Sequence, residues 1–316
     1  MPTIPSILGF GAFAIDDIVY VDQPLSAGKG KVLQSTRAFG GNVATALAAV
    51  ARLGGSAGFI GWLSSADDDA MLCDLVACGV ETAFAPRHSD ARPVRSRITV
   101  GSDGDRFIAY DDDAMLGTAP DFPDEILSRA TVLIVDSYAT RSLDVVARAR
   151  ELGLAIVGDI EWSAGPATDR LMALCDHLIL PLGFARIATG GRAPAEMLDA
   201  LWSPSRSAVV LTDGGQGAYY RGREETALRH LAPHRVAIVD STGAGDCFHG
   251  AYAQALTRGA DTAGRVAFAA AAAALSVTGR GGREALPTDD QVTELLASTN
   301  APSAVELKYA QLGTGT

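Results

Sequence analysis

The residues whose types and spacing best suit a chemical reaction form the stretch Asp240-Ser241-Thr242-Gly243-Ala244-Gly245-Asp246. An apolar segment before it, Arg235 to Val239, predicts a strand, and a helix-forming segment starts at Asp246. Free backbone N–H groups at a helix start bind anions with help from the helix dipole, and glycines let an anion approach the backbone. This pattern predicts a phosphate-binding turn.

Asp246 is the unexpected member of this turn, because a carboxylate repels a bound phosphate. A general base that takes a proton from a hydroxyl, while the N–H groups hold a transferring phosphoryl group, explains the pairing. The alternative is an ordinary helix N-cap after a glycine-rich turn. The local sequence leaves both interpretations open.

Size and composition limit the classes of function. The chain has 316 residues and a formal net charge of −11, which suits one large α/β domain and argues against a nucleic-acid partner. No apolar run approaches the roughly 20 residues that cross a bilayer, and the N-terminus lacks a signal sequence, so we expect no membrane association. The cysteines form no CxxC pair, which predicts reduced thiols and a cytoplasmic location.

Strands and helices alternate from residue 131 to residue 278, which predicts a doubly wound, mostly parallel sheet flanked by helices. Ligands of such sheets bind beyond the carboxyl ends of the strands. Two segments do not follow the alternation, about 15–37 and 91–112, and we expect them to form a small β-sheet lid over the site. We expect a domain over 1–290 and a C-terminal helix and tail over 291–316.

Several further motifs occur in a fixed order along the chain. Asp16 follows a Gly-x-Gly strand exit, and Gly40-Gly41-Asn42 opens a helix. Thr212-Asp213-Gly214-Gly215-Gln216-Gly217 follows a strand, and Gly279-Arg280-Gly281-Gly282 comes after the Asp240 stretch. Together these motifs resemble the ribokinase-like (PfkB) carbohydrate kinase family over residues 6 to 290, and look most like its ketohexokinase and sulfofructose kinase branch.

The resemblance implies an ATP-dependent kinase that transfers the γ-phosphate to a hydroxyl of a small sugar, and a hydroxymethyl group is the expected acceptor. It assigns Asp246 as the base that deprotonates this hydroxyl. The remaining roles that it implies are an anion hole at Gly243, Ala244 and Gly245, sugar contacts at Asp16, Gly41, Asn42 and Thr45, and nucleotide contacts at Thr212, Gly214, Gly217, Thr242, Gly243 and Gly245.

Cofactors follow from the same resemblance. It implies Mg²⁺ with ATP, and a monovalent cation, K⁺, held by Asp240 with Thr242 and carbonyls near Gly282. Relatives often carry Asn-x-x-Glu near Mg²⁺, whereas this chain has Pro181-Leu182-Gly183-Phe184 there. Asp159 or Glu161, which follow the preceding predicted strand, could take the place of the missing Asn-x-x-Glu side chains near Mg²⁺.

The sequence says less about the distal end of the substrate and about partner chains. Candidates for the distal contacts are Lys29, Arg97, Tyr110 and Asp136. A homodimer through the lid is common in the family and is the expected assembly. Two alternatives stay open: a nucleoside kinase of the same family, and a sugar-binding regulator that has lost turnover.

Overall fold

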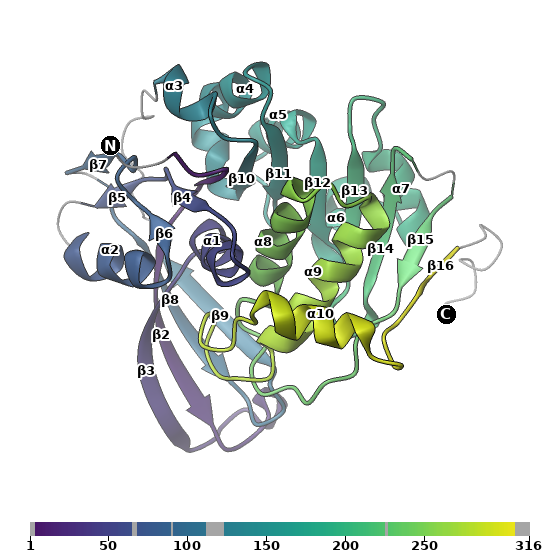
Figure 1. The fold of residues 1–316 in the computed structure, drawn as a ribbon. Coiled ribbons are helices and arrows are strands. Elements are labelled where there is room, and N and C mark those ends of the chain that lie inside the picture. The colour runs from purple at the N-terminus through teal and green to yellow at the C-terminus, as the bar shows by residue number, and fades with distance from the viewer. Residues whose placement is uncertain (1–3, 65–67, 90, 112–122, 225–226, 307–316) are drawn as a thin grey trace.

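The computed structural model describes residues 4–64, 68–89, 91–111, 123–224 and 227–306. A central sheet has the strand order β16-β15-β14-β13-β12-β11-β10-β1-β4-β6 (Figure 1). Its strands are β1 (Ile7–Phe10), β4 (Ala57–Phe59), β6 (Val80–Glu81), β10 (Val132–Asp136), β11 (Ala155–Asp159), β12 (His177–Pro181), β13 (Ala208–Thr212), β14 (Ala218–Gly222), β15 (Arg229–Leu231) and β16 (Ala304–Glu306).

The strands from β13 to β6 in that order pair in parallel, and β14, β15 and β16 extend the sheet antiparallel at one edge. Every residue of β1 and β10 is buried, as expected for parallel strands with helices on both faces. The doubly wound α/β prediction is therefore confirmed. The chain leaves β1 toward β4 on one side, while β10 lies on the other, so the switch in strand order occurs at β1.

Helices cover both faces of this sheet and divide the core in two. One apolar cluster packs one face against α1 (Asn42–Arg52), α2 (Asp68–Ala77), α8 (Ala244–Thr257), α9 (Thr262–Ser276) and α10 (Asp289–Ala297). The other face packs against α3 (Asp124–Leu127), η2 (Ser137–Ser142), α4 (Leu143–Glu151), α5 (Pro166–Leu174), α6 (Leu182–Thr189) and α7 (Pro194–Leu201). In Figure 1, α8, α9 and α10 lie in front of the sheet.

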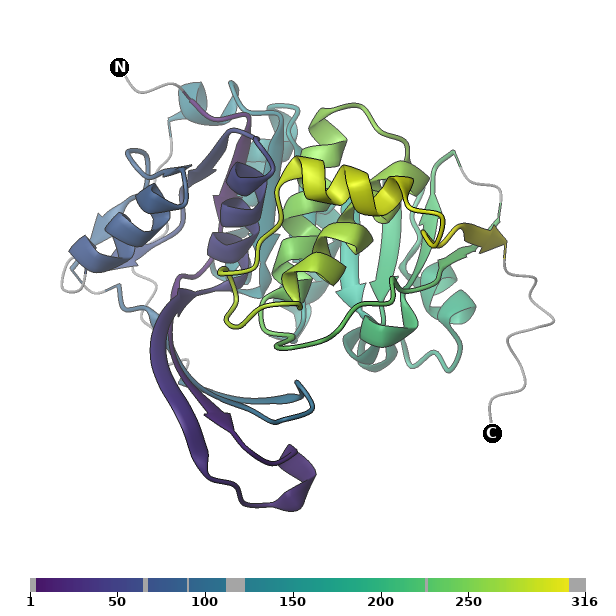
Figure 2. The same cartoon turned by 60° about the horizontal axis from the view of Figure 1, so that its bottom comes forward.

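A second, four-stranded sheet forms the lid, in the order β3-β2-β8-β9. Its strands are β2 (Ala14–Val21), β3 (Val32–Gly40), β8 (Val94–Val100) and β9 (Arg106–Asp111), with the short η1 (Leu25–Ala27) between the first two. Figure 2 shows the lid as a curved sheet that projects from the body. Its own small core consists of Ile18, Tyr20, Ile98 and Val100. A separate strand pair, β5 (Leu63–Ser64) and β7 (Arg87–His88), completes the described strands.

The prediction of a strand from Arg235 to Val239 is wrong. These residues are irregular, and the side chains of Ile238 and Val239 are 56% and 40% exposed. The reason is topological, because β16 already pairs with β15 at this edge of the sheet. The amides of Val239 and Asp240 donate instead to Val277 O at the end of α9, over 2.8 and 3.3 Å.

The C-terminal segment 291–316 contains the greater part of α10 and all of β16. Because β16 pairs with β15, the end of the described part of this segment joins the central sheet. Residues 307–316 lie outside the described residues. In the described part of the chain, we find no helix with the length and apolar character needed to cross a bilayer.

Candidate active site

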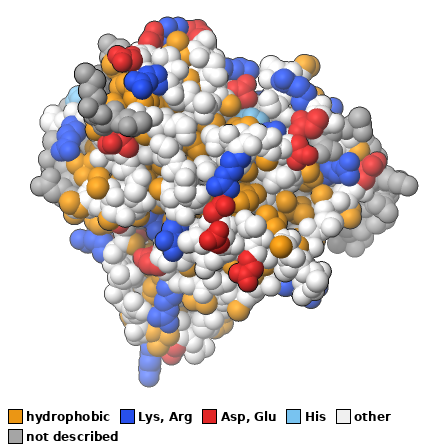
Figure 3. All heavy atoms as spheres, in the orientation of Figure 1, with side chains coloured by type: hydrophobic (Ala, Val, Ile, Leu, Met, Phe, Trp, Pro, Cys, Tyr) orange, Lys and Arg blue, Asp and Glu red, His pale blue; other side chains and the backbone are white. Residues whose placement is uncertain are grey.

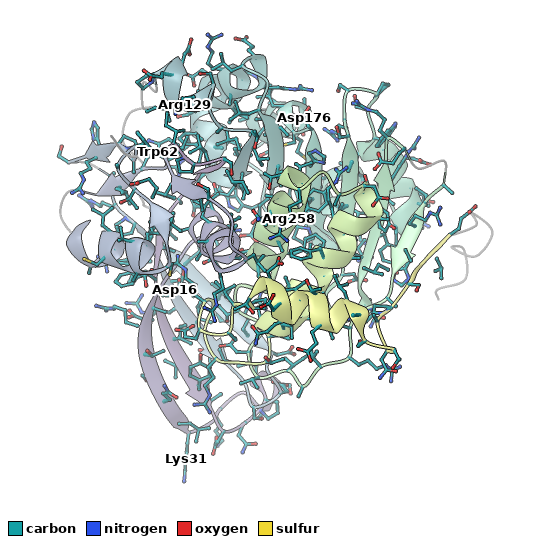
Figure 4. The ribbon with its side chains drawn as sticks, viewed as in Figure 1. Asp16, Lys31, Trp62, Arg129, Asp176 and Arg258 are labelled. Atoms are coloured by element: carbon teal, nitrogen blue, oxygen red, sulfur yellow. The ribbon has the colours of Figure 1, made fainter. Side chains whose placement is uncertain are left out.

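A cavity of about 260 Å³ opens where the lid meets the central sheet. Its wall combines residues from β2, from the start of α1, and from the loop before α8. Figure 4 shows Asp16 at this junction between lid and body. Six of the residues predicted from the sequence line the cavity: Asp16, Gly41, Thr45, Thr242, Gly243 and Asp246. The cavity therefore brings together two carboxylates with predicted roles. Asp16 is the predicted sugar contact, and Asp246 is the predicted base.

The start of α8 differs from its predicted position by two residues, because the helix begins at Ala244 and Gly243 is its N-cap. Gly243 has a φ of +74°, a left-handed conformation that favours glycine. A Cβ at this position would also lie 2.6 Å from Gly282 O. Since glycine cannot cap the helix with a side chain, the first turn presents N–H groups and the positive end of the dipole, as an anion site requires.

Asp246 lies in the first turn of α8, and its pKa is raised well above the ordinary value. Burial is the main cause, and the negative charges of Asp159 and Glu161 raise the pKa further. His249 and Arg106 act in the opposite direction. A carboxylate with a raised pKa is a stronger base than a solvated one, which suits proton abstraction from an alcohol.

Asn42 connects the start of α1 to the acidic residues beside Asp246. Its Nδ2 donates to Asp159 Oδ2 over 3.3 Å and to Glu161 Oε1 over 3.1 Å. Asn42 therefore turns toward these acids, and it is not among the residues that line the cavity. Asp159 is 4% exposed, and its pKa is raised by burial and by Glu161.

The fit of Mg²⁺ depends on these acids, because oxygen ligands suit this ion. Asp159 and Glu161 offer carboxylate oxygens at the carboxyl end of β11. However, no group of three or more His, Cys, Asp or Glu side chains is arranged to hold a metal within the described ranges. The protein groups here fit an ion held mainly by phosphate oxygens and water, with a carboxylate in support.

Asp16 is 9% exposed, and burial raises the pKa of its carboxyl group, while a hydrogen bond from Ser96 and the charge of Arg283 act against this. The backbone next to it leaves no room for another side chain, since a Cβ on Gly40 would lie 1.9 Å from Asp16 Oδ2. The glycines before α1 thus let the Asp16 carboxylate reach the cavity.

Arg283 is a cavity residue whose role the sequence did not reveal. Its Nη1 pairs with Asp74, its Nη2 donates to Gly40 O over 3.1 Å, and its Nε donates to Thr45 Oγ1 over 3.2 Å. Through these contacts, one side chain joins α2, the C-terminal end of β3, and α1. Arg283 directly follows the motif Gly279-Arg280-Gly281-Gly282, but its partners are more than 200 residues away in the sequence.

Asp240 is fully buried, and its carboxylate accepts three hydrogen bonds. Oδ2 accepts from Tyr20 Oη over 2.8 Å and from Gly281 N over 2.9 Å, and Oδ1 accepts from Thr242 N over 2.9 Å. Burial alone would raise the pKa of Asp240, but these donors outweigh it and hold the pKa below its ordinary value. The side chain therefore stays ionised and is engaged by protein donors, which does not favour it as a ligand of a monovalent cation.

None of the four distal candidates lines the cavity. Lys29, Arg97 and Tyr110 are exposed on the lid, and Figure 4 shows the nearby Lys31 at the lid tip, far from Asp16. Asp136 is buried at the end of β10 and accepts hydrogen bonds from Ala12 N over 3.0 Å and Tyr138 N over 2.9 Å. Its carboxylate caps backbone amides, which gives it a structural task.

The predicted nucleotide loop follows β13, at the carboxyl end of the same parallel strands. Thr212 ends the strand, and the turn η3 (Gly214–Gln216) leads into β14. Gly217 has a φ of +94°, and a Cβ there would lie 2.0 Å from Leu231 O, so this position requires glycine. A Cβ on Gly214 would meet nothing within 4 Å, so the turn has open space beside it.

Comparison with known proteins gives a consistent result. The model of the pfkB family carbohydrate kinase matches residues 5–289. Fructokinase-1 of Zea mays is 27% identical over 318 residues, covering 92% of this chain and 97% of that protein. Ribokinase of Bacillus subtilis is 28% identical over 307 residues, covering 92% and 99%. The crystal structure of a fructokinase with bound ATP from Xylella fastidiosa aligns with a TM-score of 0.76 at 25% identity, covering 92% and 97%.

Proposed function

Because this chain belongs to the pfkB family of carbohydrate kinases, we propose that it transfers the γ-phosphate of ATP to a hydroxyl group of a small sugar, with Asp246 as the general base. The observation that carries the proposal is the shared cavity of Asp16 and Asp246, with the glycine-capped start of α8 in its wall. We assign Asp16 to bind the acceptor and Asp246 to take its proton.

The reaction needs little covalent chemistry from the protein. Asp246 accepts the proton of the attacking hydroxyl, and the N–H groups at Gly243, Ala244 and Gly245 stabilise the charge that develops on the transferring phosphoryl group. The raised pKa of Asp246 supports the first role, and the left-handed N-cap at Gly243 supports the second. The lid excludes water and so limits hydrolysis of ATP.

ATP is the proposed donor, and the turn from Thr212 to Gly217 is the proposed site of its nucleoside end. The fructokinase from Xylella fastidiosa described above was crystallised with ATP, which supports this choice. When bound, Mg²⁺ neutralises charge on the phosphate oxygens. Asp159 and Glu161 are the side chains that we propose to support it. The monovalent cation is not part of this proposal, because three protein donors engage the Asp240 carboxylate.

The acceptor is proposed to be a sugar with a free hydroxymethyl group. Asp16 and Thr45 line the cavity and offer acceptor and donor groups for sugar hydroxyls. A site that hydrogen-bonds particular hydroxyls rejects analogues that lack them, because its own polar groups would stay unpaired. ADP release measured with ketoses, pentoses, nucleosides and sugar acids tests the proposal, and we expect turnover with a ketose or pentose. Turnover with nucleosides alone, or tight sugar binding without turnover, would contradict it.

We also propose that two copies associate through the lid. Apolar side chains are exposed on its edge strands: Val32 and Leu33 on β3 are 61% and 63% exposed, and Phe107 on β9 is 65% exposed. Figure 3 shows apolar and basic side chains next to each other on the lid. Light scattering after size exclusion tests this, and a monomer at every concentration would contradict it.

The free thiols, of which Cys73 is exposed, suit a reducing compartment such as the cytoplasm.

A further inference from the structure

The lid reaches the loop before α8 through a buried hydrogen bond. Tyr20 lies on β2 and is 6% exposed, within the small core of the lid. Its hydroxyl donates to Asp240 Oδ2 over 2.8 Å. Burial and the charge of Asp240 raise the pKa of Tyr20, so the hydroxyl keeps its proton and remains a donor.

A second contact between the lid and this loop comes from the β8–β9 hairpin, through Arg106 at the start of β9 and Gly104 in the turn. Arg106 Nη1 donates to Ser241 Oγ over 2.6 Å, and Ser241 Oγ donates to Gly104 O over 3.2 Å. The two contacts involve neighbouring loop residues, Asp240 and Ser241, and only Thr242 separates them from the helix N-cap at Gly243. The lid therefore holds the loop through β2 and through the β8–β9 hairpin.

Arg280 contacts the ring of Tyr20 and also binds the lid. Its guanidinium carbon lies 5.2 Å from the centroid of the Tyr20 ring, and its Nη1 donates to Gln34 Oε1 on β3 over 2.6 Å. The next residue, Gly281, donates its amide to the same Asp240 oxygen that accepts from Tyr20. The ring of Tyr20 is thus fixed between the lid and the segment that follows α9.

The contacts that the Asp240 carboxylate makes are with hydrogen-bond donors, which compete with a cation for its oxygens. Sites for monovalent cations are built from rings of oxygen atoms that replace the hydration shell. Here the Asp240 carboxylate is already engaged by one hydroxyl and two amides, and guanidinium groups of Arg106 and Arg280 flank the loop. The hydroxyl of Thr242 is buried with no hydrogen-bond partner among the described residues, and one such oxygen does not make a cation site.

We propose that the lid, through Tyr20, orders the phosphate-binding loop from Asp240 to Gly243, and that this chain needs no bound monovalent cation to do so. The inference rests on the proposed function only for its kinetic consequence. Tyr20 is a positioning residue, because it acts on the N–H groups of the loop through Asp240.

The first experiment compares salts. Wild-type protein is assayed in potassium chloride and in tetramethylammonium chloride at equal ionic strength, with Mg²⁺ and ATP in excess. We expect kcat values within about twofold, and equal hydrogen exchange of the amides at residues 241–245 in the two salts. Activation by K⁺ of about tenfold, or slower exchange of these amides in K⁺, would overturn the inference. If no sugar were turned over in either salt, the proposed function would fail, while the exchange measurement would still test the inference.

The second experiment removes only the hydroxyl, by Tyr20→Phe. The matched control is Thr36→Val, which changes an exposed hydroxyl on β3 of the same lid. In Tyr20→Phe we expect kcat to fall by about tenfold, equivalent to one lost hydrogen bond to a charged group, with the KM for sugar unchanged and faster exchange at 241–245. Equal kinetics and equal exchange in the two variants would show that Tyr20 does not position the loop.

Discussion

Arg283 and Asp74 form an ion pair in the wall of the cavity, with side chains only 9% and 29% exposed. The pair joins α2 to the segment after α9. Arg283 also donates to Gly40 O, at the end of the lid strand β3. Because the guanidinium of Arg283 is buried against three different elements, it contributes to the shape of the cavity as well as to stability. This dual role distinguishes it from the surface ion pairs of the chain.

Replacing Arg283 should therefore destabilise the protein. Arg283→Met leaves Asp74 without its partner, and we expect a loss of about 1–3 kcal/mol in the free energy of unfolding, below the full cost of a buried pair because Asp74 is partly exposed. The control is Arg258→Met, which breaks a pair with Asp289 whose side chains are 41% and 40% exposed. Urea denaturation of both variants measures the difference. Equal losses would contradict the special position of Arg283.

Asp16 is predicted to bind the acceptor. Asp16→Asn keeps the size of the side chain but removes its charge, so the KM for sugar should rise by about tenfold to a hundredfold, while the KM for ATP should change little. Asp17→Asn is the matched control, because Asp17 is the next residue of β2 and pairs with Arg37 on the exposed face of the lid. Steady-state kinetics with each substrate varied in turn gives both constants. An equal rise in both KM values would remove Asp16 from the sugar site.

The pKa of Asp246 predicts the acid side of the pH profile. A base must be ionised to act, so kcat/KM should fall as the pH drops through the raised pKa, at higher pH than for a free carboxyl with a pKa of about 3.9. Glu161→Gln removes a negative charge that raises this pKa, so the acid limb should move to lower pH. The profiles of both proteins are recorded at saturating Mg²⁺. A shift to higher pH would contradict the electrostatic assignment.

Gly243 is predicted to be necessary for its conformation. Gly243→Ala places a side chain at a φ of +74° and 2.6 Å from Gly282 O, so the N–H groups of the first turn should lose their alignment. We expect kcat to fall by about tenfold or more, since left-handed strain alone costs about 1–2 kcal/mol. Gly183→Ala is the control, because Gly183 lies in α6 and a Cβ there would meet nothing within 4 Å. A greater loss of kcat in the control would argue against this reason for the glycine.

The sequence predicted the elements that carry strong local signals. The apolar periodicity of α1 and the fully buried β10 made both recognisable, and the glycine-rich turns marked the loops at the carboxyl ends of the strands. In contrast, β3 was not predicted as a separate strand within the lid segment 15–37, because most of its side chains are exposed and show no clear alternation. The segment 235–239 looked like a strand, but the edge that it would need is taken by β16.

The candidate site shows the same division between local and distant information. Asp246 and Gly243 belong to a short motif, so their proximity follows from the chain itself. The link from Tyr20 to Asp240 and the contacts of Arg283 join residues more than 200 positions apart, and no local pattern reveals them. Asp136 illustrates the reverse case, because an acid at a strand end suggested a ligand contact, whereas its oxygens cap the amides of Ala12 and Tyr138.

Asp246→Asn tests the central claim most directly. The amide keeps the shape of the side chain but cannot accept the proton of the sugar hydroxyl. Turnover of the best sugar acceptor should fall by about 10²–10⁴-fold, while ATP affinity measured by calorimetry should remain close to that of the wild type. Turnover within a few-fold of the wild type would show that Asp246 is not the base, and the proposed mechanism would have to be abandoned.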